Sequence, residues 1–567
     1  MVFNNVLNDR SLEEAHAKCS FYDPYIGEDA GYLQVTHLSG RGPALVVVPD
    51  GKTPFEAYNP IRDKPDRWGA KPVFTDPTPR GITFEGFYEW MVHTQAYAED
   101  IAGLGDEGGG GAWLAPIMKE LVQPDKEELE KLQQFVDGVL WGGLQFKEGP
   151  HAYGVRKSLF YYQPDDMPSG YYRGDFDWST RTSWNKAASE RVDRSYDYPH
   201  VAAAYWVLYR LARNHKELVT NHPWDWYLDH AYETSIAMTD FAAELGAFGQ
   251  MEGDIFLQIL LDLKSEGRAE QAAKLEDRMR ARAERWRREA YPFGSEMPWD
   301  STGQEEVYGW TRYFHYDDKA DVTLNAILAY DPVIPSWGYN GSARRYWDFI
   351  YGGDPKYSRI ERQLHHYGSG INAIPLLAEY RAHPDDLYLL RAGYGGVMGP
   401  LSNIDDKGFA SAAFHSFPDM MKFDPYTGDY GPNFFGHAIN TGTFLTHDDA
   451  MGWICFGGNV ENRHGVVHAT VLDSSRNRLF IAPLGLWITL DAGHLASVDF
   501  DPAKRTVRLH LAAASAAVPT ARLRLTQTNA KAGVASWTVA TKTTTDAGAE
   551  VIPLGAAETI VTLQRKM

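Results

Sequence analysis

Helical periodicity dominates the middle of this chain. Between about residue 86 and residue 400, apolar residues recur at the three- and four-residue spacing of amphipathic helices. Twelve segments follow this pattern, although counts of ten to fourteen fit it equally: 86–103, 111–121, 125–140, 198–214, 223–245, 250–266, 267–289, 303–316, 319–330, 341–351, 364–381 and 384–396. Twelve helices in sequential pairs are the number that closes six hairpins into a double-layered ring.

Period-two patterns flank the helical region on both sides. Near the start, GYLQVTHL alternates apolar and polar residues, and ALVVVPDG is a short strand pattern that ends in a turn. Near the end, RTVRLHL places Val507, Leu509 and Leu511 on one face, and TARLRLT, ASWTVAT and ETIVTLQ repeat the alternation. The predicted fold is mainly α with β. It has three parts: a short N-terminal β region at 1–85, an (α/α)6 toroid at 86–400 and a C-terminal antiparallel β-sandwich at 401–567.

Charge and length exclude several classes of protein. The 567 residues carry a net charge of −20, which disfavours nucleic acid and anionic membrane surfaces as partners. No apolar run reaches the roughly 18 residues that span a bilayer, and the start lacks a basic-then-apolar export signal. We therefore expect a chain that is cytoplasmic, or exported with its signal removed. Cys19 and Cys455 allow at most one disulfide, and no motif implies a metal or a cofactor.

Aromatic residues give the first indication of a ligand. The chain has 17 Trp, 32 Tyr and 26 Phe, and many of them stand beside Gly, Asp or Asn rather than inside apolar runs. Rings that stack on the faces of pyranose sugars, next to polar groups that bind the hydroxyls, are what a carbohydrate-binding cleft needs. A large protein also buries many rings in its core, so composition alone leaves both interpretations open.

One long segment carries a resemblance to a known superfamily. The stretch WDSTGQEEVYGWTRYFHYDDKADVTLNAILAYDPVIPSWGYNGSARRYWDFIYGG resembles the six-hairpin glycosidases, and within them an uncharacterised domain family common in microbial carbohydrate-active proteins. The resemblance implies α/α toroids that bind glycans in the mouth of the ring, mostly with inversion at the sugar carbon. Such relatives usually have a longer N-terminal β-domain, so the short region 1–85 is a departure from their pattern.

Glycoside hydrolysis needs a carboxylic acid and a carboxylate on opposite sides of the scissile bond. The segment EMPWDSTGQEEVYGW offers Asp300, Glu305 and Glu306 next to the rings of Trp299 and Trp310. These carboxyl groups are candidate catalytic residues, and the two tryptophans are candidate contacts for the sugar.

A structural role competes for one of these carboxylates. Thr302 and Glu305 fit a capping box, in which the side chains bond to backbone N–H groups at the start of a helix. Glu305 and Glu306 also diverge by about 100° on a helix, so we do not expect both to face one cleft. Glu306 is therefore the stronger catalytic candidate of the two.

Two further segments contribute acidic candidates. In FGQMEGDIF, Glu252 lies at a glycine-rich entry to an apolar helix, where it is a candidate acid or base. In DRSYDYPHVAAAYW, Asp197 is either the N-cap of a helix or a ligand for sugar hydroxyls, and Tyr198 beside it is a candidate sugar contact.

Two aromatic segments complete the predicted binding site. The long loop around 161–186 lacks helical periodicity, and its Arg173 and Trp184 are candidates for a wall of the substrate site. In PSWGYNGSARRYWDF, Trp337 is the candidate stacking platform, with Tyr339 and Asn340 beside it, although Asn340-Gly341 also fits a simple turn.

The sequence therefore predicts a glycoside hydrolase that cleaves a neutral oligosaccharide or polysaccharide with two carboxylates, and the resemblance implies inversion. Two alternatives remain open. A polysaccharide lyase can also combine a toroid with a β-sandwich, and it would use Tyr or His as the base and Arg or a cation to neutralise a uronate. A glycan-binding protein without catalysis would use the aromatic residues alone. The sequence gives no indication of the oligomeric state.

Overall fold

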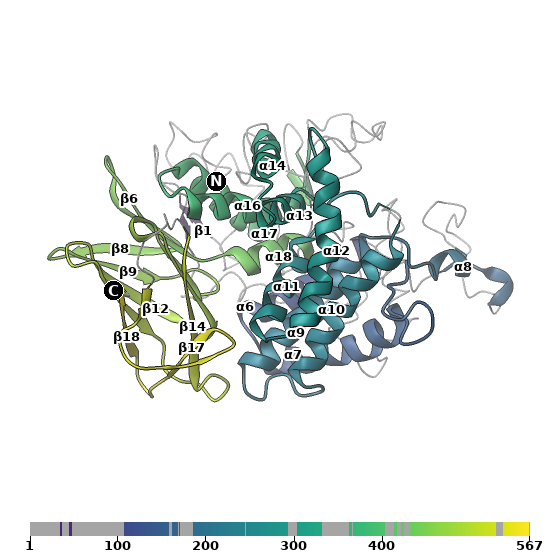
Figure 1. Cartoon of the computed structure of the whole chain (residues 1–567), viewed down its shortest axis with the longest axis horizontal. Helices are drawn as coiled ribbons and strands as arrows, with labels where there is room; N and C mark the ends of the chain where they lie inside the picture. Colours follow the sequence, from purple (N-terminus) through teal and green to yellow (C-terminus); the bar gives the residue numbers. More distant parts are fainter. Residues whose placement is uncertain are drawn as a thin grey trace.

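The helices gather on one side of the molecule and the C-terminal strands on the other (Figure 1). The computed structural model describes strands at 34–36 and 45–47 and the ranges 107–157, 161–167, 169, 185–243, 245–292, 303–330, 362–365, 367–402, 413–416, 421–423, 431–528 and 537–565. It is a helix-rich chain that ends in two sheets.

Six helices contact one another in a closed cycle. Each touches the next, and the last touches the first. In order they are α6 (Glu107–Val122), α9 (Asp197–Asn214), α11 (Asp254–Ser265), α13 (Gln304–Tyr313), α16 (Tyr367–Ala382) and α18 (Gly431–Asn440). Helix α9 is buried on nearly every side, as expected for a helix with neighbours all round it. We call these six the inner helices.

A second layer of helices packs outside this cycle. It includes α7 (Lys126–Phe135), α10 (Trp224–Phe241), α12 (Ala269–Arg288), α14 (Asp317–Tyr330) and α17 (Leu387–Ser402). Helix α12 shows the amphipathic pattern of a surface helix, since its apolar residues are buried along one stripe while most others face solvent. A short helix, α8 (Lys186–Ser189), lies apart in the chain before α9.

Ten of the twelve predicted helical segments coincide with helices, and the other two, 86–103 and 341–351, lie outside the described residues. The segment 125–140 differs in detail, because α7 gives way at Val136 to a π-helical stretch, Val136–Leu144. The predicted apolar stripe is nevertheless buried there: Leu129, Leu132, Val136, Val139 and Leu140.

Helix α18 was not predicted, and it lies beyond the expected boundary at residue 400. Its sequence, GPNFFGHAIN, is only ten residues long and begins with Gly-Pro, so helical periodicity and propensity are both weak. Packing explains why it is helical. A Cβ atom on Gly436 would lie 2.1 Å from the backbone carbon of Gly370, so α18 and α16 approach with their backbones in contact.

The inner helices run in the same direction. At their amino ends, the N–H of Gly370 in α16 bonds to Asn433 Oδ1 in α18, and His200 in the first turn of α9 reaches the loop before α11. At their carboxyl ends, the guanidinium of Arg381 in α16 lies over the ring of Trp487 in the C-terminal sheets. The amino ends therefore meet at one end of the cycle, and the carboxyl ends face the strands.

Two sheets make up the C-terminal part. The first has the order β16-β17-β14-β11-β10-β6-β7 and the second the order β15-β18-β13-β12-β9-β8. In chain order the strands are β6 (Thr443–Asp448), β7 (Gly452–Phe456), β8 (Gly458–Arg463), β9 (Val466–Val471), β10 (Arg478–Ile481), β11 (Leu486–Ala492), β12 (Leu495–Asp501), β13 (Thr506–Leu511), β14 (Thr520–Gln527), β15 (Trp537–Val539), β16 (Thr544–Asp546), β17 (Ala549–Pro553) and β18 (Thr559–Arg565).

Both sheets contribute to one hydrophobic core. The predicted inward face of β13 is confirmed, since Val507, Leu509 and Leu511 are fully buried. The pairing is antiparallel except between β6 and β10, which run parallel with Leu479 opposite Thr443. The sheets are therefore antiparallel-rich rather than purely antiparallel.

Shorter strands lie elsewhere. The predicted N-terminal strands are present as β1 (Gln34–Thr36) and β2 (Leu45–Val47), which pair antiparallel. Strands β3 (Arg362–His365), β4 (Ala413–Ser416) and β5 (Met421–Phe423) form a small antiparallel sheet, and in the chain they flank the inner helix α16 and the outer helix α17.

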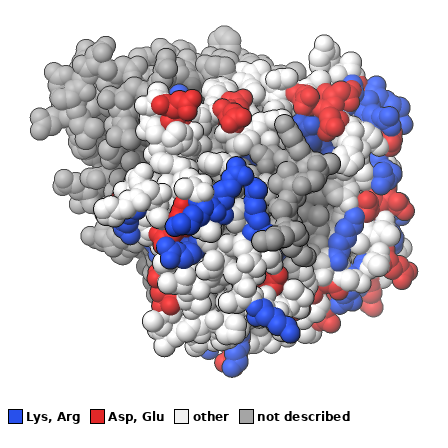
Figure 2. All heavy atoms as spheres, turned by 60° about the vertical axis from the view of Figure 1, so that its left-hand side comes forward, with Lys and Arg blue, Asp and Glu red and all other residues white. Residues whose placement is uncertain are grey.

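The negative net charge is not spread evenly over the surface. Figure 2 shows a group of Lys and Arg side chains near the centre of one face, with acidic side chains towards its upper edge. Within the described ranges, no helix is both long enough and apolar enough to span a membrane.

The contact between Gly436 and Gly370 gives a stability prediction. We expect Gly436→Ala to lower the free energy of unfolding by about 1–3 kcal/mol or more, because the added methyl group overlaps a backbone that cannot retreat. Denaturation by urea measures the change. Gly138→Ala is the matched control, since a Cβ there meets no atom within 4 Å. An equal loss in both variants would contradict the close approach.

Candidate functional site

The site is built around the loop 249–253, which leads into α11. A Cβ on Gly249 would lie 2.1 Å from the carbonyl oxygen of Gly303, and one on Gly253 would lie 2.6 Å from Cγ of Glu306. Glycine is needed at both positions because the loop lies directly against the start of α13.

Glu306 is held by an ion pair. Its Oε2 accepts hydrogen bonds from the backbone N–H of Gln250 at 2.6 Å and from Arg282 Nη2 at 2.7 Å, and its Oε1 also accepts from Arg282. Arg282 donates further to the carbonyl oxygens of Gly246 and Phe248. Burial raises the pKa of Glu306, while Arg282 and the N–H of Gln250 oppose that rise. Both carboxylate oxygens of Glu306 are therefore hydrogen-bonded, and these bonds connect α12, α13 and the loop.

Glu305 has one oxygen bonded and one free. Oε1 accepts from the backbone N–H of Gly253 at 3.0 Å, whereas Oε2 is buried and has no hydrogen-bond partner among the described residues. Burial raises the pKa of Glu305 well above its usual range, and the nearby Glu306 and Asp254 add to the rise. Burial thus favours the protonated form of Glu305, in which Oε2 can carry the proton and act as a donor.

The start of α13 does not match the capping box that was predicted for Thr302 and Glu305. Gly303, without a side chain, occupies the N-cap position of α13, and Glu305 reaches across to the loop instead of back to its own helix. Glu305 and Glu306 nevertheless both reach loop 249–253, where they accept from the N–H groups of Gly253 and Gln250 respectively. Whether they face one cleft stays a prediction.

His200 and Glu252 form a buried pair at the centre of the site. His200 Nδ1 lies 3.0 Å from Glu252 Oε2, and both side chains are almost fully excluded from solvent. When Glu252 is ionised its oxygen accepts a hydrogen bond, and in a neutral imidazole Nδ1 then carries the proton and Nε2 the lone pair. His200 Nε2 and Glu252 Oε1 have no partner in the part of the chain that the structure describes. The imidazole is therefore oriented with a free basic nitrogen.

The backbone at Glu252 is strained. Its φ of 69° is in the left-handed region, which costs a non-glycine residue roughly 1–3 kcal/mol. Burial raises the pKa of Glu252, and the hydrogen bond from His200 opposes this. Strain of this kind concentrates at functional sites, so the loop conformation supports a role beyond packing.

Other polar groups of the segments that carry the site residues are also buried. The side-chain oxygens of Ser195 and Gln250, and both amide atoms of Gln304, lack partners among the residues described. Buried polar groups are nearly always hydrogen-bonded, so each of these exceptions indicates a place for a ligand or for water. Across the described ranges, no group of three His, Cys, Asp or Glu side chains is arranged to hold a metal ion.

Three predicted sugar contacts occupy different surroundings. Asp197 is the first residue of α9, with Tyr196 rather than Asp197 at the N-cap, and its Oδ1 lies 3.8 Å from Arg194 Nε. Tyr198 is fully buried and donates to the carbonyl oxygen of Val192 at 2.6 Å. Trp310 is fully buried and stacks on Phe314. Burial leaves neither Tyr198 nor Trp310 an open ring face for a sugar.

The remaining predicted residues lie outside the described residues: Arg173, Trp184, Trp299, Asp300, Trp337, Tyr339 and Asn340. Sequence reasoning in turn missed His200 and Arg282. The sequence does contain an indication of Arg282, because this charged residue interrupts the apolar stripe of α12 between Met279 and Trp286. His200 follows Asp197 by three residues in the first turn of α9, which places it at the same helix end as the candidate acids.

Asp254 gives the site a measurable pH dependence. It is buried at the start of α11, where Gln258 donates to its Oδ2, and burial raises its pKa from 3.8 to about 6. Between these values the folded chain holds a proton that the unfolded chain has lost, so stability falls as the pH rises. We expect Asp254→Asn to become more stable relative to the parent, by up to about 3 kcal/mol, between pH 4 and pH 7. Urea denaturation across this range measures the difference.

Asp546 provides a control with the opposite sign. Hydrogen bonds from Arg213 and Arg522 lower its pKa to about 2, so its stabilising effect is present above pH 4 and is lost as the pH falls towards 2. Asp546→Asn should therefore be less stable than the parent at neutral pH. A difference between Asp254→Asn and the parent that is constant with pH would show that Asp254 has no raised pKa.

Comparison with solved structures gives a distant match to a polysaccharide lyase. The identity is 18%, the TM-score is 0.43, and the alignment covers 60% of this chain and 46% of the lyase. The chain thus spans about half the length of that protein. A comparison with curated proteins gives no match.

The prediction of a glycoside hydrolase was wrong. A solved structure to which the chain is similar is a polysaccharide lyase, not a hydrolase. The favoured catalytic residue, Glu306, is moreover tied to Arg282 and to the N–H of Gln250. The resemblance to the six-hairpin glycosidases stays a prediction.

A family model matches nearly the whole sequence. It aligns with residues 1–100 and 100–562, and its description is a family of unknown function, DUF5695. The match far exceeds half of the chain. This protein therefore belongs to the DUF5695 family.

Proposed function

We propose that this chain is a carbohydrate-active enzyme, a lyase that cleaves an acidic polysaccharide by β-elimination. The reaction takes place at the amino ends of the inner helices, with His200 as the base. In this proposal the closed cycle of six helices is the inner ring of an (α/α)6 toroid, and the outer helices complete its hairpins.

The observation that carries the proposal is the His200–Glu252 pair. Glu252 fixes the tautomer of the imidazole through Nδ1, and Nε2 is left with a lone pair and no partner among the described residues. A histidine oriented by a carboxylate is an effective general base. The strained backbone at Glu252 supports the same role, since it holds the carboxylate in place for this contact.

Each step of the elimination has a group to perform it. His200 Nε2 takes the proton from C5 of a uronate residue, and the electron pair of that bond forms a C4=C5 double bond. The C4–O bond to the leaving sugar breaks, and the leaving oxygen receives a proton from the imidazolium or from solvent. No water is consumed, so the reaction balances without a second carboxylate to activate water.

In this proposal Glu305 donates a hydrogen bond to the carboxylate of the uronate. Burial raises the pKa of Glu305 and so favours its protonated form, and Oε1 already accepts from the N–H of Gly253. Oε2 is then the donor that would bind the uronate carboxylate. A hydrogen bond from a neutral acid withdraws electron density from that carboxylate, which makes the C5 proton easier to remove.

Local charge at the site is less negative than the number of acids implies. Glu306 is neutralised by Arg282, and the pKa values of Glu305, Glu252 and Asp254 are all raised by burial. The whole-chain charge of −20 therefore does not exclude an acidic substrate at this position.

A panel of neutral and acidic polysaccharides tests the proposal. We expect soluble products that absorb ultraviolet light through the new C4=C5 bond, from an acidic polysaccharide only. His200→Ala should lower the rate by about 10²–10⁴-fold, the usual contribution of a general base. Glu252→Gln should lower it less, because an amide oxygen still accepts from Nδ1. Product absorbance over time measures each rate.

His510→Ala is the matched control, since this histidine bonds to Asp499 and Glu558 on the sheets and touches no group of the site. It should keep the parent rate. Three results would overturn the proposal: elimination that is unaffected by His200→Ala, new reducing ends without ultraviolet absorbance, or glycan binding without any product.

A further inference from the structure

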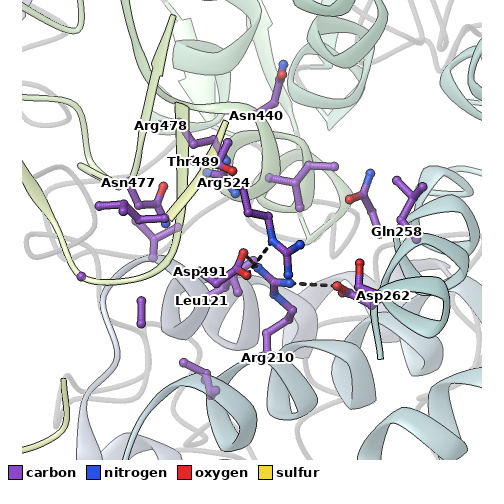
Figure 3. Close-up of a pocket in the computed structure, with 18 of the residues that line it drawn as sticks. Leu121, Arg210, Gln258, Asp262, Asn440, Asn477, Arg478, Thr489, Asp491 and Arg524 are labelled. Atoms are coloured by element: carbon purple, nitrogen blue, oxygen red, sulfur yellow. Dashed lines mark hydrogen bonds and ion pairs between the residues drawn. The ribbon is translucent and has the colours of Figure 1, made fainter. Parts of the chain in front are cut away.

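A cavity lies at the opposite end of the inner helices from His200. It has a volume of about 420 Å³ and is lined by the carboxyl ends of α6, α9, α11, α16 and α18 on one side and by β11 and β14 on the other (Figure 3). This volume is in the range of cavities that hold small molecules.

Cations outnumber anions in its lining. Four arginines face two aspartates: Arg210, Arg381, Arg478, Arg524, Asp262 and Asp491. The two lining histidines, His215 and His494, add no charge at neutral pH, because burial lowers the pKa of both, that of His215 to about 4. The cavity therefore holds two more positive charges than negative ones, in a chain whose net charge is −20.

Between them, two of the four arginines form ion pairs with both aspartates. Arg210 pairs with Asp262 at 2.9 Å and with Asp491 at 2.7 Å, and Arg524 pairs with the second oxygen of Asp491 at 2.7 Å (Figure 3). These contacts lock α9 and α11 to strands β11 and β14. No aspartate of the cavity is left for Arg381 or Arg478.

Arg381 and Arg478 are held by contacts other than ion pairs with carboxylates. Arg478 Nη1 donates to the carbonyl oxygens of Ala438 and Thr441 at the end of α18. Arg381 lies over the Trp487 ring, and its Nη1 is buried without a hydrogen-bond partner among the described residues. Within the same residues, neither guanidinium has an acidic oxygen within 4.0 Å. Burial lowers the pKa of each to about 10.

A third donor lies nearby. Asn440 also lines the cavity, is 4% exposed, and has an amide nitrogen, Nδ2, that is buried and lacks a partner in the described part of the chain. Guanidinium groups that are partly buried without a carboxylate, and a buried amide without a partner, are unfavourable unless a ligand supplies acceptors. The acceptors that fit guanidinium groups best are the oxygens of carboxylate, sulfate and phosphate.

We propose that this cavity is a binding site for a small oxyanion, held by Arg381, Arg478 and Asn440. Its ligand is a sulfate, a phosphate, or the carboxylate of an acidic sugar. The two surplus charges favour a dianion over a monoanion. The site is separate from His200, and this inference does not rest on the lyase proposal.

Binding should also stabilise the fold, because the lining comes from both the helices and the sheets. An anion that binds only the folded chain raises the midpoint of thermal unfolding, and the stabilisation grows with the logarithm of its concentration above Kd. A bound anion would therefore join the inner helices to the C-terminal sheets, in addition to the ion pairs of Arg210 and Arg524.

Calorimetric titration and thermal unfolding of the full chain test the inference. The ligands are inorganic phosphate, inorganic sulfate and glucuronate, each compared with chloride at equal ionic strength. We expect at least one of them to bind and to raise the unfolding midpoint. Phosphate or sulfate alone would identify an inorganic anion or ester, and glucuronate alone an acidic sugar, and each result supports the site.

Variants locate the binding. Arg381→Gln and Arg478→Gln should each weaken it at least tenfold, whereas Arg463→Gln makes the same charge change at an exposed position of β8 and should leave it unchanged. If a glutamine variant fails to fold, Asn440→Leu tests the same site without removing a charge. The inference fails if no ligand exceeds chloride, or if Arg381→Gln and Arg478→Gln bind as the parent does. Neither failure alters the dependence of elimination on His200.

Discussion

The ion pair between Arg282 and Glu306 is the contact on which the candidate site depends. It is buried, and it joins the outer helix α12 to the first turn of α13 while Glu306 also accepts from the N–H of Gln250. Removing one partner of such a pair leaves an uncompensated charge, which typically costs about 3–5 kcal/mol. The pair thus holds loop 249–253 against α13, and the loop in turn sets the backbone of Glu252 and the position of its carboxylate beside His200.

The common direction of the inner helices explains why the two ends of the cycle differ chemically. Helix amino ends present N–H groups and a partial positive charge, which suits acids such as Asp254 and Glu305. Helix carboxyl ends present carbonyl groups and a partial negative charge, which suits Arg381 and Arg478. One arrangement of helices therefore collects acids at one end and cations at the other, and the acidic chain as a whole still contains a basic cavity.

The sequence predicted the helices and the segments of the site far better than the roles of the residues in them. Amphipathic periodicity found ten described helices, and spacing alone pointed to Glu252, Glu305 and Glu306, which do meet at one loop. Periodicity could not find α18, because contact between glycine backbones rather than a side-chain stripe makes it part of the cycle. Nor could periodicity show that Arg282 forms an ion pair with Glu306, since the two residues are 24 positions apart and lie on different helices.

The two ends of the cycle are connected through α11. Gln258 lines the basic cavity and donates to Asp254 Oδ2 one turn earlier, and the charge of Arg381 acts to lower the pKa of Asp254 against the effect of burial. Asp254 in turn adds to the raised pKa of Glu305. An anion bound at Arg381 would offset part of that guanidinium's charge, so it would favour the protonated form of Asp254. A less charged Asp254 repels the carboxylate of Glu305 less, and the acidity of the candidate donor therefore depends on what occupies the far end of the same helices.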